Sequence, residues 1–343
     1  MNTFGTIFRV SIFGESHGEE IGVILDGVEP GVALSEQDFA EDIARRRSGA
    51  KGTTPRIEAD EPHILSGVFE GHTTGAPLTI VFKNTNTRSQ DYSRLKDVPR
   101  PGHADFTANV KYGGFQDPRG GGHFSGRLTL PVVAAGVVAK KILAETIDEE
   151  TNGHVQFRCR ARLTEIGGFT DVNDWEKALE QAQKEGDSLG GVVECVVDGL
   201  PAGLGEPFWD NVESKLAHAL FAIPGVRGVE FGDGFAAARM KGSEHNDRFT
   251  PDGIDGHEGL VTPETNHAGG VNGGITNGNP LVFRVAFKPT SSIAKAQETF
   301  DFAKGEMTVL QVPGRHDTCF ALRTPVIVEA MAAIVLADLI DLA

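Results

Sequence analysis

The feature that most constrains the fold of this chain is an internal duplication. The stretch "GESHGEEIGVILDGV", which starts at Gly14, aligns without gaps with "GDSLGGVVECVVDGL", which starts at Gly186. Two further pairs follow in the same order, about half a chain apart: "GHTTGAPL" with "GITNGNPL", and the helical stretches that open "PVVAAG" and "PVIVEA". This order predicts a single domain made of two halves packed around a pseudo-twofold axis, approximately 1–170 and 171–343.

Hydrophobic periodicity predicts both strands and helices. Short or alternating apolar runs predict strands at 5–14, 21–28, 77–83, 190–200, 226–232 and 280–288. Helical spacing of apolar residues predicts helices at 35–47, 131–147, 172–186, 207–221 and 325–343. Ser35 and Asp38 form a capping pair for the first of these helices. The last helix is very apolar, but it is short for a membrane span and carries acidic residues, so we expect it to be buried.

Charge and cysteine content exclude several classes of partner. The formal net charge of -16 argues against nucleic acid and acidic membrane surfaces, although a local site can still bind an anionic small molecule. The three cysteines lie far apart and form no CxxC pair, which indicates a reducing, cytoplasmic setting. The N-terminus shows no basic segment followed by an apolar run, so a signal peptide is not expected.

Two histidines lie in glycine-containing turns. His17, in "FGESHG", aligns with Leu189 of the second half, so the turn itself does not require an imidazole. A histidine there could give a proton to a leaving group, or it could be a hydrogen-bonded turn residue. His103, in "RPGHAD", has Asp105 two residues on and could be an oriented acid or base. The H-x-D spacing also occurs in metal sites, but no second histidine lies at metal-binding helical spacing.

Several stretches are suited to binding an anion. "DPRGGGHFSGR" combines three glycines with Arg119, His123, Ser125 and Arg127 just before a helix, which favours an anion site over a plain hinge. "RRR" at 45–47 could clamp a phosphate or carboxylate, or interact only with the helix dipole and solvent. "KPTSS", which starts at Lys288, and "GRHDTC" offer hydroxyl and cationic groups, although either could be an ordinary turn.

Taken together, these motifs resemble the chorismate synthase family over nearly the whole chain. The resemblance rests on "FGESHG", "RRR", "NTNTRSQDYS", "RPGHADFTANVKYG", "RGGG", "EGDSLGG", "GLPAGLGEPFWD", "GVEFGDGF", "NHAGG", "KPTSS" and "GRHDTC" in this order. It implies elimination of phosphate and a ring proton from 5-enolpyruvylshikimate 3-phosphate to give chorismate. It also implies a requirement for reduced FMN without net redox change.

The resemblance also assigns roles to residues. It implies that His17 protonates the departing phosphate, that His103 protonates the reduced flavin, and that Asp317 assists proton removal near flavin N5. Arg46 and Arg127 are implied as substrate ligands. The implied FMN contacts are His123, Phe124, Ser125, Gly273, Lys288, Pro289, Thr290, Ser291, Ser292 and Arg315.

The implied fold is of the α/β (α+β) class, a β-α-β sandwich with helices layered between two antiparallel sheets. The family is typically a homotetramer, and this short chain is expected to need an external flavin reductant, with NADP involved. Two departures occur: "GGGHFSGR" where the family usually reads "GGGRSSAR", and "RHDTC" where it reads "RHDPC". The imidazole of His123 cannot make the bidentate contacts of an arginine. A flavin- or phosphate-binding protein without turnover and a metal-dependent hydrolase are the alternatives.

Overall fold

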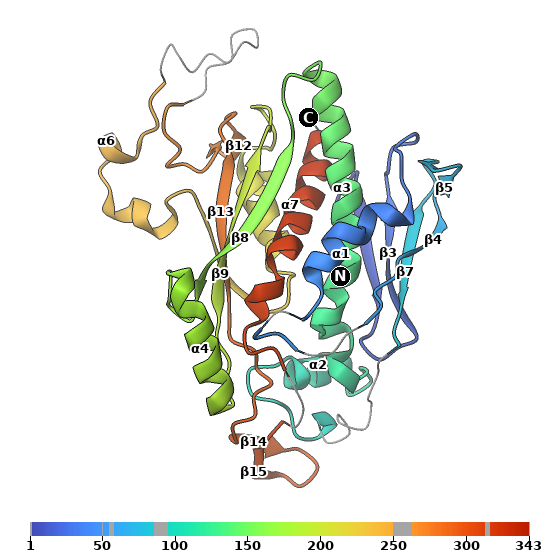
Figure 1. Ribbon diagram of the computed structural model, residues 1–343, viewed down its shortest axis with the longest axis vertical. Coiled ribbons are helices and arrows are strands. Elements are labelled where there is room, and N and C mark those ends of the chain that lie inside the picture. The colour runs from blue at the N-terminus through green and yellow to red at the C-terminus, as the bar shows by residue number, and fades with distance from the viewer. Residues whose placement is uncertain are drawn as a thin grey trace.

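The protein is a three-layer sandwich in which a pair of long helices lies between two antiparallel sheets (Figure 1). The computed structural model describes residues 2–49, 51–54, 58–85, 95–249, 263–312 and 316–342. The central helices are α3 (Thr129–Glu150) and α7 (Pro325–Ile340). The predicted fold class is confirmed.

Apart from the edge strand β1, the two sheets share one strand order, in which β2-β3-β7-β4 corresponds to β8-β9-β13-β10. The first runs β1-β2-β3-β7-β4, with β1 at Thr3–Phe4, β2 at Arg9–Gly14, β3 at Glu20–Asp26, β7 at Leu78–Lys83 and β4 at His63–Ser66. The second runs β10-β13-β9-β8, with β10 at Val226–Phe231, β13 at Leu281–Phe287, β9 at Gly191–Asp198 and β8 at Arg158–Ile166. All six predicted strands are confirmed within a few residues at their ends, whereas β1, β4 and β8 of these sheets were not predicted.

The remaining elements are helices around the sandwich and short hairpins. The helices are α1 (Ala40–Arg46), α2 (Asp105–Tyr112), α4 (Val172–Glu185), α5 (Val212–Leu220) and α6 (Gly242–His245). The hairpins pair β5 (Val68–Phe69) with β6 (His72–Thr73), β11 (Val271–Asn272) with β12 (Ile275–Thr276), and β14 (Gln297–Asp301) with β15 (Glu306–Leu310). All five predicted helices form, and Ser35 and Asp38 make the predicted capping box. The sequence did not predict α2 or α6.

The duplication is visible in hydrogen bonds as well as in strand order. The Thr73 hydroxyl donates to the carbonyl of Glu29 and accepts the Val32 N–H at 3.0 Å. In the second half, the Thr276 hydroxyl donates to the carbonyl of Pro201 at 2.7 Å and accepts the Leu204 N–H at 2.9 Å. The same side chain therefore closes the same loop in each half, which supports the alignment made from sequence.

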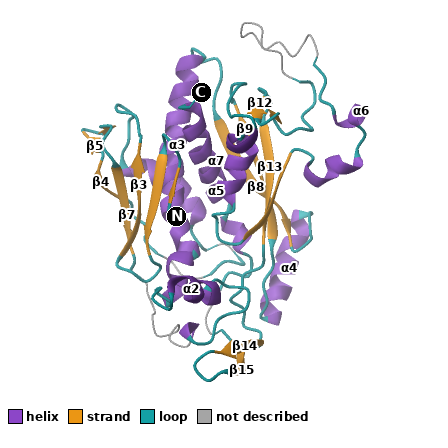
Figure 2. Ribbon diagram, turned by 180° about the vertical axis from the view of Figure 1, so that it is seen from behind, coloured by secondary structure: helices purple, strands orange, loops and turns teal. Residues whose placement is uncertain are grey.

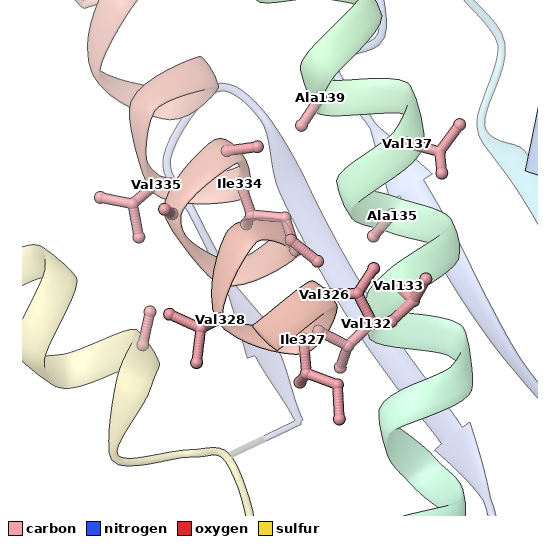
Figure 3. Close-up of a cluster of buried hydrophobic side chains, with 14 of the residues drawn as sticks. Val132, Val133, Ala135, Val137, Ala139, Val326, Ile327, Val328, Ile334 and Val335 are labelled. Atoms are coloured by element: carbon pink, nitrogen blue, oxygen red, sulfur yellow. The ribbon is translucent and has the colours of Figure 1, made fainter. Parts of the chain in front are cut away.

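The two central helices cross at equivalent positions of the repeat. A Cβ placed on Gly136 of α3 would overlap Ala330 of α7, so the glycine lets the two backbones touch. These residues stand at the same place in the stretches "PVVAAG" and "PVIVEA". A twofold axis brings a residue against its own equivalent, as this crossing does. Aliphatic side chains of both helices, among them Val132 and Val326, fill the space around it (Figure 3).

Polar groups on the buried helix α7 all have partners that explain their burial. Glu329 is 2% exposed, and its two oxygens accept hydrogen bonds from Arg45 at 2.6 and 2.8 Å and from Lys140 at 2.9 Å. Burial alone would raise the pKa of Glu329, but these two cations hold it below its usual range. Asp338 is fully buried and accepts three backbone N–H groups of residues 6–8. No helix in the described part of the chain combines the length and apolarity needed to cross a membrane.

Candidate active site

The three-glycine segment of the 3-10 helix Arg119–Phe124 packs against the two turn histidines. A Cβ on Gly120 would overlap the ring of His17, and a Cβ on Gly121 would lie 3.3 Å from Cε1 of His103. Both glycines have left-handed backbone angles, with φ of +60° and +85°. Adjacent glycines of one loop therefore pack against His17 and His103, which are far apart in sequence.

The His17 turn is fastened to this loop by two hydrogen bonds. The Ser16 N–H donates to the carbonyl of Gly122 at 3.1 Å, and Nδ1 of His123 lies 2.8 Å from the carbonyl oxygen of Gly14. Because a carbonyl only accepts, Nδ1 of His123 carries the hydrogen. In this chain, the imidazole of His123 holds the turn that carries His17.

Phe124 and Ser125, which were predicted with His123 to contact the flavin, lie at the end of the same loop. Phe124 is 37% exposed, lies 6.3 Å from the ring of Tyr112 between centroids, and lines a small hollow with His103 and Gly121. Ser125 accepts the backbone N–H of Arg127 at 3.3 Å and so begins the turn that leads into α3. Their roles as flavin contacts stay predictions.

The "KPTSS" loop after β13 packs against the turn that carries His103. The Ser291 hydroxyl donates to the carbonyl of Gly102 at 2.8 Å, and the Ser292 hydroxyl accepts from Arg100 at 3.0 Å. Lys288 donates to Ser291, and burial, followed by the nearby Arg227, lowers the pKa of this lysine. The second half of the repeat thus contributes directly to the surroundings of His103.

Thr290 offers a polar atom to a ligand. Its Oγ1 is buried and has no hydrogen-bond partner among the residues that the structure describes. Its carbonyl, in contrast, accepts from Ser188 at 2.7 Å, which fixes the loop. Pro289 precedes it and is exposed. A buried hydroxyl of this kind is suited to a bound group rich in hydrogen-bonding atoms.

Buried guanidinium groups gather beside the glycine loop. Arg46, 4% exposed, donates to Thr129 and to the carbonyl of Gly126, both at 3.0 Å. Arg127 bonds Asp60, and a second oxygen of Asp60 lies 3.5 Å from Arg46. Burial and, after it, the charge of Arg323 lower the pKa of Arg46 to about 9. An anion bound here would relieve that unfavourable charge.

Asp317 lies next to these arginines through Arg323. Its Oδ2 accepts from Arg323 at 2.8 Å, and its Oδ1 accepts the Thr54 N–H at 2.8 Å. The Arg323 guanidinium also lies over the ring of Phe320, 5.4 Å from its centroid. The three arginines outnumber Asp60 and Asp317, so this part of the site is cationic.

One predicted contact lies away from this cluster, and a second is outside the described residues. Gly273 lies between β11 and β12, and Figures 1 and 2 both place β12 at the end of the long axis opposite α2 and β14. Arg315 falls outside the described residues. Among the residues that are described, no group of three or more His, Cys, Asp or Glu side chains could hold a metal ion.

Comparisons with known proteins identify the family of this chain. A family model described as "Chorismate synthase" matches residues 8–340. The chain belongs to the chorismate synthase family. It is 59% identical over 338 residues to "Chorismate synthase" of Chitinophaga pinensis, a match that covers 98% of this chain and 96% of that protein.

More distant members of the chorismate synthase family match over the same length. The chain is 46% identical over 363 aligned positions to "Chorismate synthase" of Dehalococcoides mccartyi, with coverage of 98% and 96%. A solved structure described as "Crystal Structure of Chorismate Synthase" matches with a TM-score of 0.72 at 27% identity, and covers 98% of this chain and 92% of that one. This likeness confirms the fold predicted from the family resemblance.

Sequence reasoning missed four residues of this candidate site. Arg100 and Ser16 lie within the motifs of His103 and His17 but were assigned no role, and Asp60 and Arg323 lie in no motif. The available signal was weak: each arginine lies a few residues from a singled-out acid or histidine. At the second departure, Thr318 stands where the family usually has proline. The carbonyl of Thr318 accepts a hydrogen bond from the Leu189 N–H at 2.7 Å.

Proposed function

We propose that this chain is a lyase that converts 5-enolpyruvylshikimate 3-phosphate to chorismate by 1,4-anti elimination of phosphate and a ring proton. The observation that carries the proposal is the glycine loop, in which Gly120 packs against His17 and Gly121 packs against His103. Two titratable groups packed against one loop suit a reaction in which a leaving group and a cofactor each need a proton donor. The alignment of His17 with Leu189 indicates that the first turn does not require an imidazole.

Substrate binding falls to the cationic cluster. The cluster contains the guanidinium groups of Arg46, Arg127 and Arg323. Only two carboxylates, of Asp60 and Asp317, neutralise them. The remaining positive charge suits a substrate that carries phosphate and carboxylates. His17, 6% exposed, gives a proton to the leaving phosphate oxygen. Asp317, oriented by Arg323 and Thr54, assists removal of the ring proton.

The residues present fit reduced FMN. Three groups offer donors to a flavin edge or phosphate: the buried Thr290 hydroxyl without a partner in the described chain, the cation of Lys288, and the hydroxyl of Ser292, which accepts from Arg100 and keeps its own hydrogen. Phe124 and His103 line the adjoining hollow. When bound, reduced flavin lends electron density to a substrate that is losing an anion. His103 holds the proton that the reduced ring exchanges.

An anaerobic assay tests the proposal. Purified protein, chemically reduced FMN and 5-enolpyruvylshikimate 3-phosphate are mixed, and chorismate absorbance and phosphate release are followed together. We expect equal amounts of both products with reduced FMN and none with oxidised FMN. Flavin binding without turnover would favour a binding protein that retains the fold. Phosphate release that needs an added metal and no flavin would favour a hydrolase.

Substitution of Gly120 is expected to reduce turnover sharply. In Gly120→Ala the new Cβ overlaps the His17 ring and the left-handed backbone is strained, so the imidazole is displaced. We expect kcat to fall about 100-fold, the scale of an ångström misplacement of a reacting group. The matched control is Gly168→Ala, which has a similar left-handed φ of +91° with nothing within 4 Å of the new Cβ. Equal activity of the two variants would contradict the proposed placement of His17.

Other properties of the family extend the proposal. We expect a homotetramer, an external flavin reductant and a cytoplasmic location, and we propose that the repeat divides the domain near residue 170. The first of these is tested by light scattering of the purified protein, and the second by turnover with FMN, NADPH and a separate flavin reductase.

A further inference from the structure

We propose that Arg100 is a positioning residue for His103. It fixes the tautomer of this imidazole through Asp105, and it ties the imidazole to the 288–292 loop through Ser292. The inference deepens the proposed function, because His103 acts on the flavin only if that function holds. Its test therefore includes a readout that needs neither flavin nor substrate.

The hydrogen bonds around Arg100 form one connected unit. Its Nε and one terminal nitrogen each donate to Asp105 at 2.8 Å, and its backbone N–H adds a third bond to the same carboxylate at 3.0 Å. The other terminal nitrogen donates to Ser292 at 3.0 Å. Nδ1 of His103 lies 2.6 Å from Oδ1 of Asp105. The terminal nitrogen of Arg100 that donates to this oxygen also lies 3.0 Å from Nδ1. All of these groups are mostly buried, with the side chains of Arg100 and Asp105 only 5% and 9% exposed.

The carboxylate decides where the hydrogen of His103 resides. Burial alone would raise the pKa of Asp105, but hydrogen bonds from Arg100 and His103 hold it well below its usual range. Nδ1 of His103 can serve only one of its two neighbours. The carboxylate oxygen is the closer, at 2.6 Å against 3.0 Å for the Arg100 nitrogen, and that nitrogen already donates to Asp105. Nδ1 of His103 therefore carries the hydrogen and donates it to the carboxylate. The other charged side chains around the hollow are Lys96 and Asp117. Neither has a hydrogen bond with His103 among the bonds that the structure describes.

This arrangement leaves Nε2 as the atom that exchanges a proton. A Cβ on Gly121 would lie 3.5 Å from Nε2, so this edge of the ring faces the glycine loop and the hollow that Phe124 lines. The opposite edge is held by Asp105, which Arg100 holds in turn. A partner that orients an imidazole in this way sets its tautomer and its direction. The hydrogen bond from Arg100 to Ser292 links the 288–292 loop to the same unit.

The tautomer is read directly by nuclear magnetic resonance. Protein labelled with 15N on histidine, without flavin or substrate, is examined at a pH where His103 is neutral, and its signal is assigned by loss in His103→Gln. We expect the Nδ1–H form in the wild type and a large fraction of the Nε2–H form in Asp105→Asn. An Nε2–H form in the wild type would overturn the inference, whatever the activity. An Nδ1–H form with no turnover would leave the inference intact and refute the proposed function.

Kinetics separate the contact of Arg100 with Asp105 from its contact with Ser292. Asp105→Asn is expected to lower kcat by about 100-fold or more with little change in KM, because the misplaced hydrogen affects the reaction and not binding. Ser292→Ala is expected to keep the Nδ1–H tautomer and to weaken FMN binding about tenfold. Arg100→Lys, which keeps the charge and loses the fork, should do both.

A remote arginine provides the control. Arg162 pairs with Glu194 at 2.8 Å on an exposed part of the second sheet, so Arg162→Lys makes the same change away from the site. It should leave tautomer, kcat and FMN affinity unchanged. If Arg100→Lys matches this control in all three measurements while remaining folded, Arg100 does not position His103. A loss of stability alone, with the tautomer and kcat preserved, would also overturn the inference.

Discussion

Replacement of Asp317 by Asn is expected to lower kcat by about 100- to 10,000-fold, the usual range for loss of a positioned base. The amide keeps the shape of the carboxyl and can still accept the Thr54 N–H that now lies 2.8 Å from Oδ1. It cannot accept a proton, and its NH2 group would face the Arg323 donor that now lies 2.8 Å from Oδ2. Initial rates with reduced FMN measure the effect.

The Asp317→Asn result is diagnostic because KM is not expected to rise. Removal of a negative charge beside Arg46 and Arg323 makes the site more cationic, so an anionic substrate should bind at least as well. Asp26→Asn is the control, since Asp26 also pairs with an arginine, Arg9, but on an exposed strand pair. A large rise in KM with unchanged kcat would show that Asp317 acts in binding and not in proton transfer.

The second large effect concerns the helix crossing at the centre of the fold. Gly136→Ala should destabilise the protein by about 3 kcal/mol, the upper part of the range for overpacking. The reason is that the new methyl group overlaps both the side chain and the backbone of Ala330, and α3 and α7 must separate. The better helix propensity of alanine returns only about 1 kcal/mol. Urea or thermal unfolding followed by circular dichroism measures the change.

Compensation at the facing position tests the pseudo-symmetry itself. Ala330→Gly alone should cost about 1 kcal/mol through helix propensity. The double variant, Gly136→Ala with Ala330→Gly, exchanges the two residues across the crossing and should recover most of the stability lost in Gly136→Ala. Strict additivity of the two single changes would mean that the residues do not share one space, and would contradict the crossing described here.

Much of the architecture could be predicted from sequence because each half repeats its pattern. The strands at β3 and β9, the loops closed by Thr73 and Thr276, and the two central helices all have a counterpart that confirms the alignment. The missed elements have weaker local signals. The strand β8 reads "RCRARLTEI", in which the residues between the arginines are small, so its hydrophobic signal is weak. The short helix α2 reads "DFTANVKY", in which polar and apolar residues alternate, so it does not show the helical period.

The site divides in the same way. Sequence alone determined that His17 is an addition to its turn, that His103 has a carboxylate nearby, and that three glycines precede a helix, because turn chemistry and short spacing are local properties. Only the tertiary structure decided that Gly120 and Gly121 pack against the two histidines, and that the Thr54 N–H reaches Asp317. Likewise, only it assigned His123 to the Gly14 carbonyl. These contacts depend on how the strand ends, the glycine loop and the start of α7 come together, and no local pattern encodes a distance between segments that far apart in the chain.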